Sequence, residues 1–200
     1  MVDQLDSASS NHTDDKLIDD YLAGEEAALP ILINRYLKTI YNFCYRLTGN
    51  AQDAEDVAQE TFVKTWRHLK KYRHGKNFRT WLFAIARNTA IDLLRKKKSL
   101  VFSDFSTGDG EDENPLLNTL ADENPLADEL LIRHADTKLL DARIQQLPPH
   151  YREILLLYYN HDITLDEISH ILKKPLNTVK SQHRRGLMAL RNLLQSNNKK

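Results

Sequence analysis

Apolar residues recur every three or four positions along most of the chain, which is the spacing of one face of an α-helix. Such runs, together with few clusters of β-branched residues, predict an all-α protein. The predicted helices cover residues 14–23, 25–46, 51–71, 79–98, 130–147 and 151–159, and a further helical pair lies within residues 163–194.

Residues 100–129 lack this periodicity and are rich in Asp, Glu, Asn and Gly. A segment with so much acid and so little apolar surface is expected to be extended and flexible. The sequence therefore predicts two small helical domains, residues 14–99 and residues 130–196, joined by a flexible acidic linker.

The C-terminal helical pair begins with the pattern of a capping box. The Thr164 side chain can accept from the backbone three residues later, and the Glu167 side chain can reach back to the backbone of Thr164. Leu165, Ile168 and Leu172 follow at helical spacing and form one apolar face. These features predict a short helix with one buried side.

A turn and a longer basic helix are predicted next. Pro175 is expected to end the first helix, and Asn177 to supply left-handed backbone for the turn before a second helix that begins near Thr178. The buried side of that helix comprises Val179, Leu187, Leu190 and Leu194. Its polar residues, most of which should face outward, are Lys180, Ser181, Gln182, His183, Arg184, Arg185 and Arg191. This is the pattern of a helix-turn-helix, whose second helix enters the DNA major groove. A solvated helical hairpin is the simpler alternative.

The distribution of charge supports a nucleic-acid partner, although the formal net charge is zero. Residues 64–98 carry many Lys and Arg against the single acid Asp92, and no acid occurs from Lys173 onward. Residues 103–136 are acidic, with Arg133 as their only Lys or Arg. Such segregation predicts basic binding faces, with the acids placed elsewhere.

The third predicted helix carries its acids in the first turns, where they suit the positive end of the helix dipole. These polar residues are Asp53, Glu55, Asp56, Gln59 and Glu60. The face expected to be buried comprises Val57, Ala58, Thr61, Phe62, Trp66 and Leu69. Two interpretations stay open for the acids, namely capping with solubility, or a docking surface for a basic partner.

A basic loop at residues 70–78 precedes the fourth predicted helix. Cations suit phosphates, while aromatic and Asn side chains suit unpaired bases, so this combination favours single-stranded nucleic acid. Phe78 and Trp81 fit equally well as members of the hydrophobic core.

Cys44 is the only cysteine, which excludes a disulfide framework and a Cys-based metal site within the sequence. Its apolar surroundings predict a small core residue. No secretory signal or membrane-spanning run is recognisable, so a cytoplasmic protein without membrane insertion is expected. No phosphate loop, nucleophile motif or cofactor site is recognisable either, which predicts a protein that is not an enzyme.

Motifs of both halves occur in a fixed order. The first half contains Asp53-Ala54-Glu55-Asp56, Gln59-Glu60, Phe62 and Trp66, then Thr80-Trp81-Leu82, Ile85-Ala86, Asn88, Ala90 and Asp92. The second half contains Leu147-Pro148, Arg152, Thr164, Glu167-Ile168, Thr178-Val179-Lys180-Ser181 and Arg185. In these motifs the chain resembles the extracytoplasmic-function (ECF) group of bacterial RNA polymerase sigma factors, of the sigma-70 family. The resemblance covers nearly all of residues 17–194 except the linker.

The resemblance implies a sigma factor that binds core RNA polymerase, directs it to specific promoters and promotes DNA melting. The clamp helices of the polymerase would contact Asp53, Glu55, Asp56, Gln59 and Glu60. The unpaired −10 strand would be bound by Arg73, Lys76, Arg79, Arg87 and Asn88. The −35 duplex would be bound by Thr178, Lys180, Ser181, Gln182, Arg184 and Arg185. The polymerase flap and an anti-sigma factor are further implied partners.

Three positions depart from the family pattern. Gln182 and His183 stand where Arg and an apolar residue are commoner, which changes the expected −35 preference. Gly186 stands where Ala is usual, and glycine within a helix costs up to about 1 kcal/mol.

Two other functions fit parts of the chain. A dimeric helix-turn-helix repressor or activator would explain the second half, but it has no use for an acidic helix followed by a basic loop. An enzyme acting on DNA, such as a nuclease, would need clustered catalytic carboxylates, which the sequence lacks.

Overall fold

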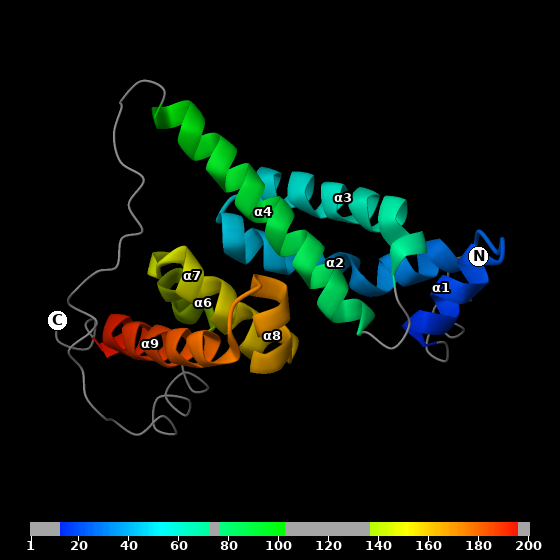
Figure 1. The fold of residues 1–200 in the computed structure, drawn as a ribbon. Coiled ribbons are helices and arrows are strands. Elements are labelled where there is room, and N and C mark those ends of the chain that lie inside the picture. Colours follow the sequence, from blue (N-terminus) through cyan, green and yellow to red (C-terminus); the bar gives the residue numbers. More distant parts are fainter. Residues whose placement is uncertain (1–12, 73–76, 103–136, 196–200) are drawn as a thin grey trace. The chain divides into compact units, whose positions relative to one another are not determined.

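The computed structural model describes residues 13–72, 77–102 and 137–195, and it is helical throughout these ranges apart from short connections (Figure 1). The helices of the first half are α1 (Asp14–Leu22), α2 (Ala28–Thr48), α3 (Ala51–His68), the 3₁₀ turn η1 (Leu69–Lys71) and α4 (Phe78–Phe102). Those of the second half are α6 (Thr137–Gln146), α7 (Pro149–Leu155), the π-helix η3 (Leu156–Asn160), α8 (Leu165–Leu172) and α9 (Leu176–Gln195). The all-α prediction is confirmed.

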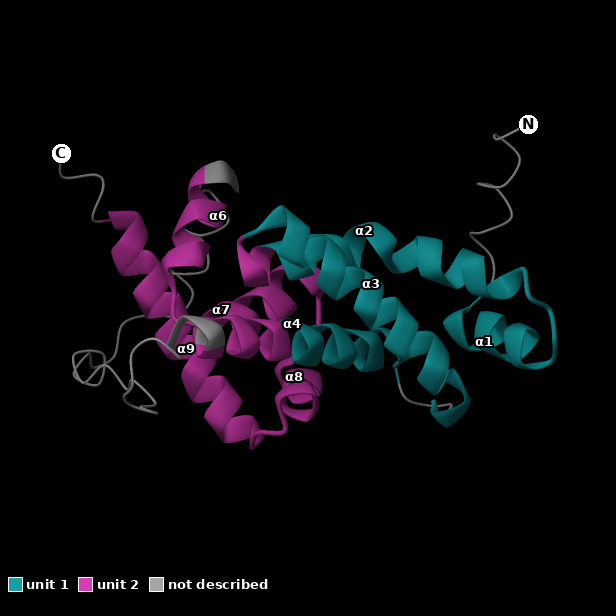
Figure 2. Cartoon of the chain, turned by 90° about the horizontal axis from the view of Figure 1, so that it is seen from above, with its two compact units in different colours: residues 1–45, 50–90 teal, residues 46–49, 91–200 magenta. Residues whose placement is uncertain are grey.

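The chain divides into two compact units (Figure 2). Unit 1 comprises residues 1–45 and 50–90, and unit 2 comprises residues 46–49 and 91–200. Most of the predicted acidic linker and the first residues of the predicted helix 130–147 lie outside the described residues. The domain boundaries 14–99 and 130–196 stay predictions.

The core of unit 1 forms where α2, α3 and α4 pack together. Phe43 of α2 and Phe83 of α4 are both fully buried and meet edge to face, with ring centroids 5.0 Å apart. Leu37 of α2 is 48% exposed, although it follows the apolar spacing of the helix. Phe83 and its chain neighbour Leu82 are both fully buried, so the buried face of α4 is broad at this point.

Cys44 lies in this core with no exposed surface, as predicted. Burial raises the pKa of its thiol to about 12, so the reactive thiolate is scarce at neutral pH. We expect the folded protein to react negligibly with Ellman's reagent at pH 8 over minutes, and to release one equivalent of thionitrobenzoate after denaturation. Rapid release from the folded protein would contradict this packing.

The paired prolines start a helix in unit 2. Pro149 occupies the first turn of α7, where its missing N–H costs nothing. The Arg152 guanidinium then reaches back to the end of α6 and donates to the carbonyl oxygens of Gln145 at 2.6 Å and Leu147 at 3.0 Å. A C-terminal helix end leaves such carbonyls without helical partners. The Leu-Pro-x-x-x-Arg motif therefore closes one helix and opens the next.

The capping box of α8 is confirmed. Thr164 Oγ1 accepts from the Glu167 backbone N–H at 3.2 Å, and Glu167 Oε2 accepts from the Thr164 N–H at 3.0 Å. The turn that follows differs from the prediction. Helix α8 ends at Leu172, and the left-handed residue is Lys173, with φ of 53°, instead of Asn177.

The cause of this shift lies in the backbone hydrogen bonds of the turn. The Ser169 carbonyl accepts from the N–H groups of both Lys173 and Lys174, which offsets the cost of left-handed backbone at a lysine. The carbonyl of Pro175 accepts from Thr178 and Val179, so Pro175 opens α9. Asn177 already lies inside α9. The prediction that Pro175 ends the first helix was therefore wrong, and so was the prediction that Asn177 supplies the left-handed backbone of the turn.

Candidate functional site

Acidic and amide side chains form a continuous stripe on the outer face of α3. Its members, which we call the acidic stripe, are Glu55, Asp56, Gln59 and Glu60, and all four are exposed. Residues four apart are neighbours on a helix, so 55 with 59 and 56 with 60 form two adjacent rows. The stripe presents three carboxylates within two turns to any partner that approaches this face.

Asp53, the fifth residue of the predicted cluster, lies apart from the stripe. It is only 8% exposed, and its backbone N–H donates to the Asn50 side chain, which caps α3, at 3.0 Å. Residue 53 lies three positions before Asp56 and seven before Glu60, so helical spacing alone would place it beside the stripe, and its burial at the start of the helix sets it apart. The five predicted residues are thus split between an exposed face and the N-terminal cap.

Apolar side chains extend the acidic stripe toward the end of α3. Val63 is 38% exposed and Trp66 is 51% exposed, although the sequence pattern placed Trp66 inside. The Trp66 indole N–H donates to the Tyr21 hydroxyl of α1 at 2.7 Å, a bond that draws the ring outward across the helix surface. The prediction for Trp66 was therefore wrong, because a tertiary hydrogen bond decided its orientation.

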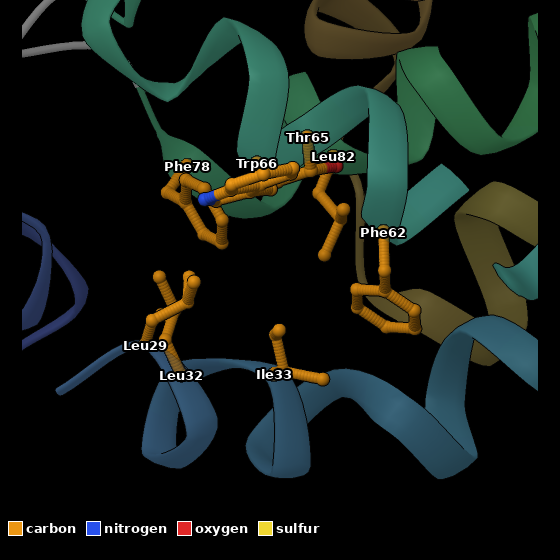
Figure 3. A pocket seen from close by; sticks show the side chains of 8 residues that line it. All are labelled: Leu29, Leu32, Ile33, Phe62, Thr65, Trp66, Phe78 and Leu82. Atoms are coloured by element: carbon orange, nitrogen blue, oxygen red, sulfur yellow. The ribbon is translucent and has the colours of Figure 1, made fainter. Parts of the chain in front are cut away.

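A small apolar pocket, partly open to solvent, lies beside this end of α3 (Figure 3). The side chains that line it are Leu29, Leu32, Ile33, Phe62, Thr65, Trp66, Phe78 and Leu82. Trp66 thus belongs both to the wall of the pocket and to the exposed surface of α3. The pocket places an apolar hollow next to the acidic stripe.

The described −10 candidates lie along α4. Arg79 and Arg87 are half-exposed and Asn88 is exposed. They span about 13 Å of helix at 1.5 Å per residue. Arg87 donates to the Asn88 side-chain oxygen at 3.2 Å, which orients that amide. Arg73 and Lys76, the other two candidates, lie outside the described residues.

Aromatic rings gather at the start of α4. Phe78 is buried, and it packs against Tyr72 and Trp81 with centroid distances of 5.6 Å and 5.7 Å. Tyr72 and Trp81 are also in ring contact, at 5.5 Å. Phe78 is therefore a core residue, whereas Trp81 is half-exposed.

The DNA-facing candidates of α9 lie mostly on one exposed side. Thr178, Lys180, Ser181, Arg184 and Arg185 are exposed. Gln182 is half-exposed, and its side-chain oxygen accepts from Lys174 at 3.3 Å across the turn between α8 and α9. We define the first five residues together with Gln182 as the basic face of α9.

His183 is buried, unlike its neighbours on α9. It is 8% exposed and packs against two consecutive tyrosines of the π-helix η3. Its ring centroid lies 4.8 Å from that of Tyr158 and 5.6 Å from that of Tyr159. A π-helix changes the direction of successive side chains, which allows both rings to reach the histidine. The apolar residue usual in the family is thus replaced by an aromatic stack.

Gly186 lies where α9 packs closely against α7. A Cβ atom at this position would lie 3.2 Å from the Tyr151 Cβ and 3.5 Å from the Leu155 Cδ1. The absence of a side chain therefore permits close helix packing, which offsets the loss of helix propensity expected from the sequence.

Substitution of Gly186 tests this packing. Gly186→Val is expected to lower the free energy of unfolding by about 1–3 kcal/mol, because overpacking displaces the neighbouring helix. Gly186→Ala is expected to change it by less than about 1 kcal/mol, because the gain in helix propensity opposes the steric cost. Denaturant unfolding followed by circular dichroism measures both, with Asn192→Val on the exposed side of α9 as the control. Equal losses at residues 186 and 192 would contradict the assignment.

Neither a candidate metal cluster of His, Cys, Asp or Glu nor a helix long and apolar enough to cross a membrane occurs among the described residues. The surfaces that remain are the acidic stripe with its adjoining pocket, the solvent-accessible residues of α4, which we call the outer side of α4 (Arg79, Trp81, Arg87 and Asn88), and the basic face of α9. Their chemistry suits binding to proteins and nucleic acids.

Comparisons with known proteins identify the family of the chain. The family profile for sigma-70 region 2 matches residues 32–100, and that for sigma-70 region 4 matches residues 143–192. The chain is 32% identical to the ECF RNA polymerase sigma factor SigW of Bacillus subtilis, over 86% of this chain and 91% of SigW. It is 30% identical to the RNA polymerase sigma-H factor of Pseudomonas aeruginosa, over 91% of this chain and 94% of that protein.

Solved structures share the fold. The sigma factor RpoE of Bartonella quintana, solved with the anti-sigma factor NepR, matches 82% of this chain and 94% of its own, with a TM-score of 0.62 and 22% identity. CnrH, solved with the cytosolic domain of CnrY, matches 90% of this chain and 96% of its own, also with a TM-score of 0.62 and 22% identity. The chain therefore belongs to the ECF RNA polymerase sigma factors of the sigma-70 family, which direct RNA polymerase to specific promoters to initiate transcription.

Proposed function

We propose that the acidic stripe of α3 binds the clamp helices of core RNA polymerase. Three carboxylates that are exposed in two adjacent rows offer a negative surface, which steers and orients a basic partner. The apolar Val63 and Trp66 continue this surface, and such desolvated contacts supply most of the affinity of an interface. Asp53 is buried beside the cap of α3 and is not part of the proposed contact surface.

The outer side of α4 binds the unpaired −10 strand in this proposal. Arg79 and Arg87 provide cations for phosphates, and Asn88 provides an amide of fixed orientation for a base edge. The half-exposed face of Trp81 gives an unpaired base a surface on which to stack. Arg73 and Lys76 remain proposed contacts on the basis of their charge.

The basic face of α9 enters the major groove of the −35 duplex. This assignment is carried by one observation, the exposed side of α9 that bears Lys180, Arg184 and Arg185 and no acid. The capped α8 and the tight turn hold this side away from the core of the unit, as in other helix-turn-helix modules. Arg and Gln are suited to the edges of purine bases.

Further partners follow from the same assignments. The polymerase flap is proposed to contact the second unit, and an anti-sigma factor is proposed as the regulator, in line with the NepR complex of a similar structure. The protein is proposed to act in the cytoplasm as a non-enzymatic subunit of the transcription machinery, without a cofactor.

Reconstituted transcription tests the proposal. Core polymerase is combined with the full chain, and the holoenzyme selects promoters from a pool of random DNA, followed by run-off transcription from the selected sequences. We expect enrichment of paired −35 and −10 elements and transcripts that depend on the added chain. A stable dimer that binds a palindromic duplex without polymerase, and leaves transcription unchanged, would contradict the proposal and support a repressor.

A further inference from the structure

Two carboxylates at the start of α1 are bonded to aromatic residues that surround the first turn of α4. We propose that Asp14 and Asp15 are positioning residues that hold the aromatic cluster of Tyr36, Tyr72, Phe78 and Trp81 in the arrangement required for promoter opening. This inference rests on the proposed function of the outer side of α4.

Asp15 fixes Tyr72. The Tyr72 hydroxyl donates to Asp15 Oδ1 at 3.0 Å, although the two residues lie 57 positions apart in the chain. Tyr72 is buried, and a buried hydroxyl needs a partner to offset the loss of water. Burial, and then the bond to Asp15, raise the pKa of Tyr72 above its ordinary value. The phenol therefore stays protonated and donates to the carboxylate at physiological pH.

Asp14 fixes a second tyrosine, Tyr36. Its Oδ1 accepts from the Arg35 guanidinium and its Oδ2 from the Tyr36 hydroxyl, each at 2.5 Å. Burial, and then the bond to Asp14, raise the pKa of Tyr36, so this phenol also remains a donor. Charge-assisted hydrogen bonds of this kind are about twice as strong as neutral ones.

Tyr36 and Tyr72 both pack against the ring of Phe78. Phe78 packs edge to face against Tyr36 at 5.6 Å and 62°, and against Tyr72 at 5.6 Å and 85°. Trp81 then packs against Phe78 and Tyr72 at 5.7 Å and 5.5 Å. Phe78 is thus held between two rings, each of which is bonded to a carboxylate of α1.

The alternative is that the two acids serve only the helix dipole of α1. Thr13 already caps this helix by accepting from the Lys16 N–H, and acids in a first turn gain from the dipole without any tertiary partner. Asp14 and Asp15 are instead half-buried, and each bonds a residue of another helix or turn. Those tertiary bonds are the observation that the dipole leaves unexplained.

The position of the cluster gives it a role in opening DNA. Tyr72 precedes and Phe78 follows the basic stretch that contains Arg73 and Lys76, and the rings of Tyr72 and Phe78 are in contact. Trp81 lies about one turn after Phe78 on α4 and is half-exposed. Loss of a carboxylate in α1 would loosen the rings of Tyr72, Phe78 and Trp81 together.

The test uses the full chain assembled with core polymerase on a promoter with 2-aminopurine in the −10 element. Asp15→Ala and Tyr72→Phe are each expected to slow promoter opening on the order of tenfold, since each removes the same charge-assisted hydrogen bond. The double variant is expected to be no slower than the slower single variant. Asp15→Asn, which keeps an acceptor oxygen, is expected to recover most of the rate.

Matched measurements separate positioning from general damage. Asp20→Ala removes a half-exposed carboxylate of the same helix and is expected to open DNA at the wild-type rate. Affinity for core polymerase and thermal stability are measured for every variant, and Tyr72→Phe keeps the ring and its packing. Opening rates that stay at the wild-type level, or that fall only in step with polymerase affinity or stability, would overturn the inference. If the wild-type holoenzyme itself opened no promoter, the proposed function would fail.

Discussion

Asp56→Lys combined with Glu60→Lys is expected to lower the affinity of the chain for core RNA polymerase at least about 100-fold. Close charge pairs across interfaces couple by about 1.5–7 kcal/mol, and each 1.4 kcal/mol is about tenfold in affinity. Two reversals turn two attractive contacts into repulsive ones on the same stripe. Because both side chains are exposed, the interior of unit 1 is left unchanged.

The folded state of this variant should be close to wild type. Glu60 gives up a pairing with Lys64 at 3.4 Å, one turn along the helix, and such surface pairs contribute only about 0.3–0.5 kcal/mol. Circular dichroism checks the helix content, and competition against a labelled sigma factor measures the affinity. Glu25→Lys with Glu26→Lys supplies the control, because it makes the same change of charge at two exposed positions before α2. Equal losses of affinity in both pairs would mean that overall charge, and not the acidic stripe, governs binding.

The helices were predictable because their signals are local. The capping box of Thr164 and Glu167 depends on residues three apart, and the structure contains it. The all-α class followed in the same way from apolar spacing. The stop of α1 was equally local, since Gly24 just beyond its end has a φ of 107° that suits glycine.

The predicted orientation of a side chain was wrong where a partner distant in the sequence decides it. Trp66 follows the buried spacing of α3, yet its indole bonds Tyr21, which lies 45 positions earlier, and half of its surface is exposed. The prediction of the turn after α8 was wrong for another reason, because Lys173 has no sequence signature of left-handed backbone. There the pairing of two N–H groups with the Ser169 carbonyl sets the conformation.

The candidate site was likewise predictable only where local helical spacing decides which residues share a face. Four polar residues of α3 share an exposed face, which helical spacing alone places together. The contributions of Asp14 and Asp15 carry no such signal, because their partners lie 21 to 57 residues away and their type is equally explained by the helix dipole. His183 and Gly186 depart from the family pattern, and the sequence alone does not explain why. The structure explains both, because His183 packs against Tyr158 of η3 and Gly186 lies against Tyr151 of α7.

Arg185→Ala is expected to weaken binding of the holoenzyme to a −35 duplex by about 1–3 kcal/mol, if Arg185 makes a bidentate contact to guanine, and to relax specificity at one base pair. Lys180→Ala is expected to act differently. As a phosphate contact it should weaken binding to all sequences alike and reduce the salt slope by about one. Both side chains are exposed, so neither change removes a packed group.

The comparison of the two variants distinguishes base-specific contacts from phosphate contacts on the same helix. Binding is measured against every single-base substitution of the selected −35 element at several salt concentrations. Arg191→Ala removes the same charge from α9 as Arg185→Ala, but Arg191 lies about 9 Å further toward the C-terminal end of the helix and about 120° around it from residue 185, beyond the N-terminal part of α9 that is proposed to meet bases. It should therefore leave base preference unchanged. A uniform loss for Arg185→Ala, with the wild-type preference retained at each base pair, would assign Arg185 to the phosphates and leave the reading of bases to other residues of the basic face of α9.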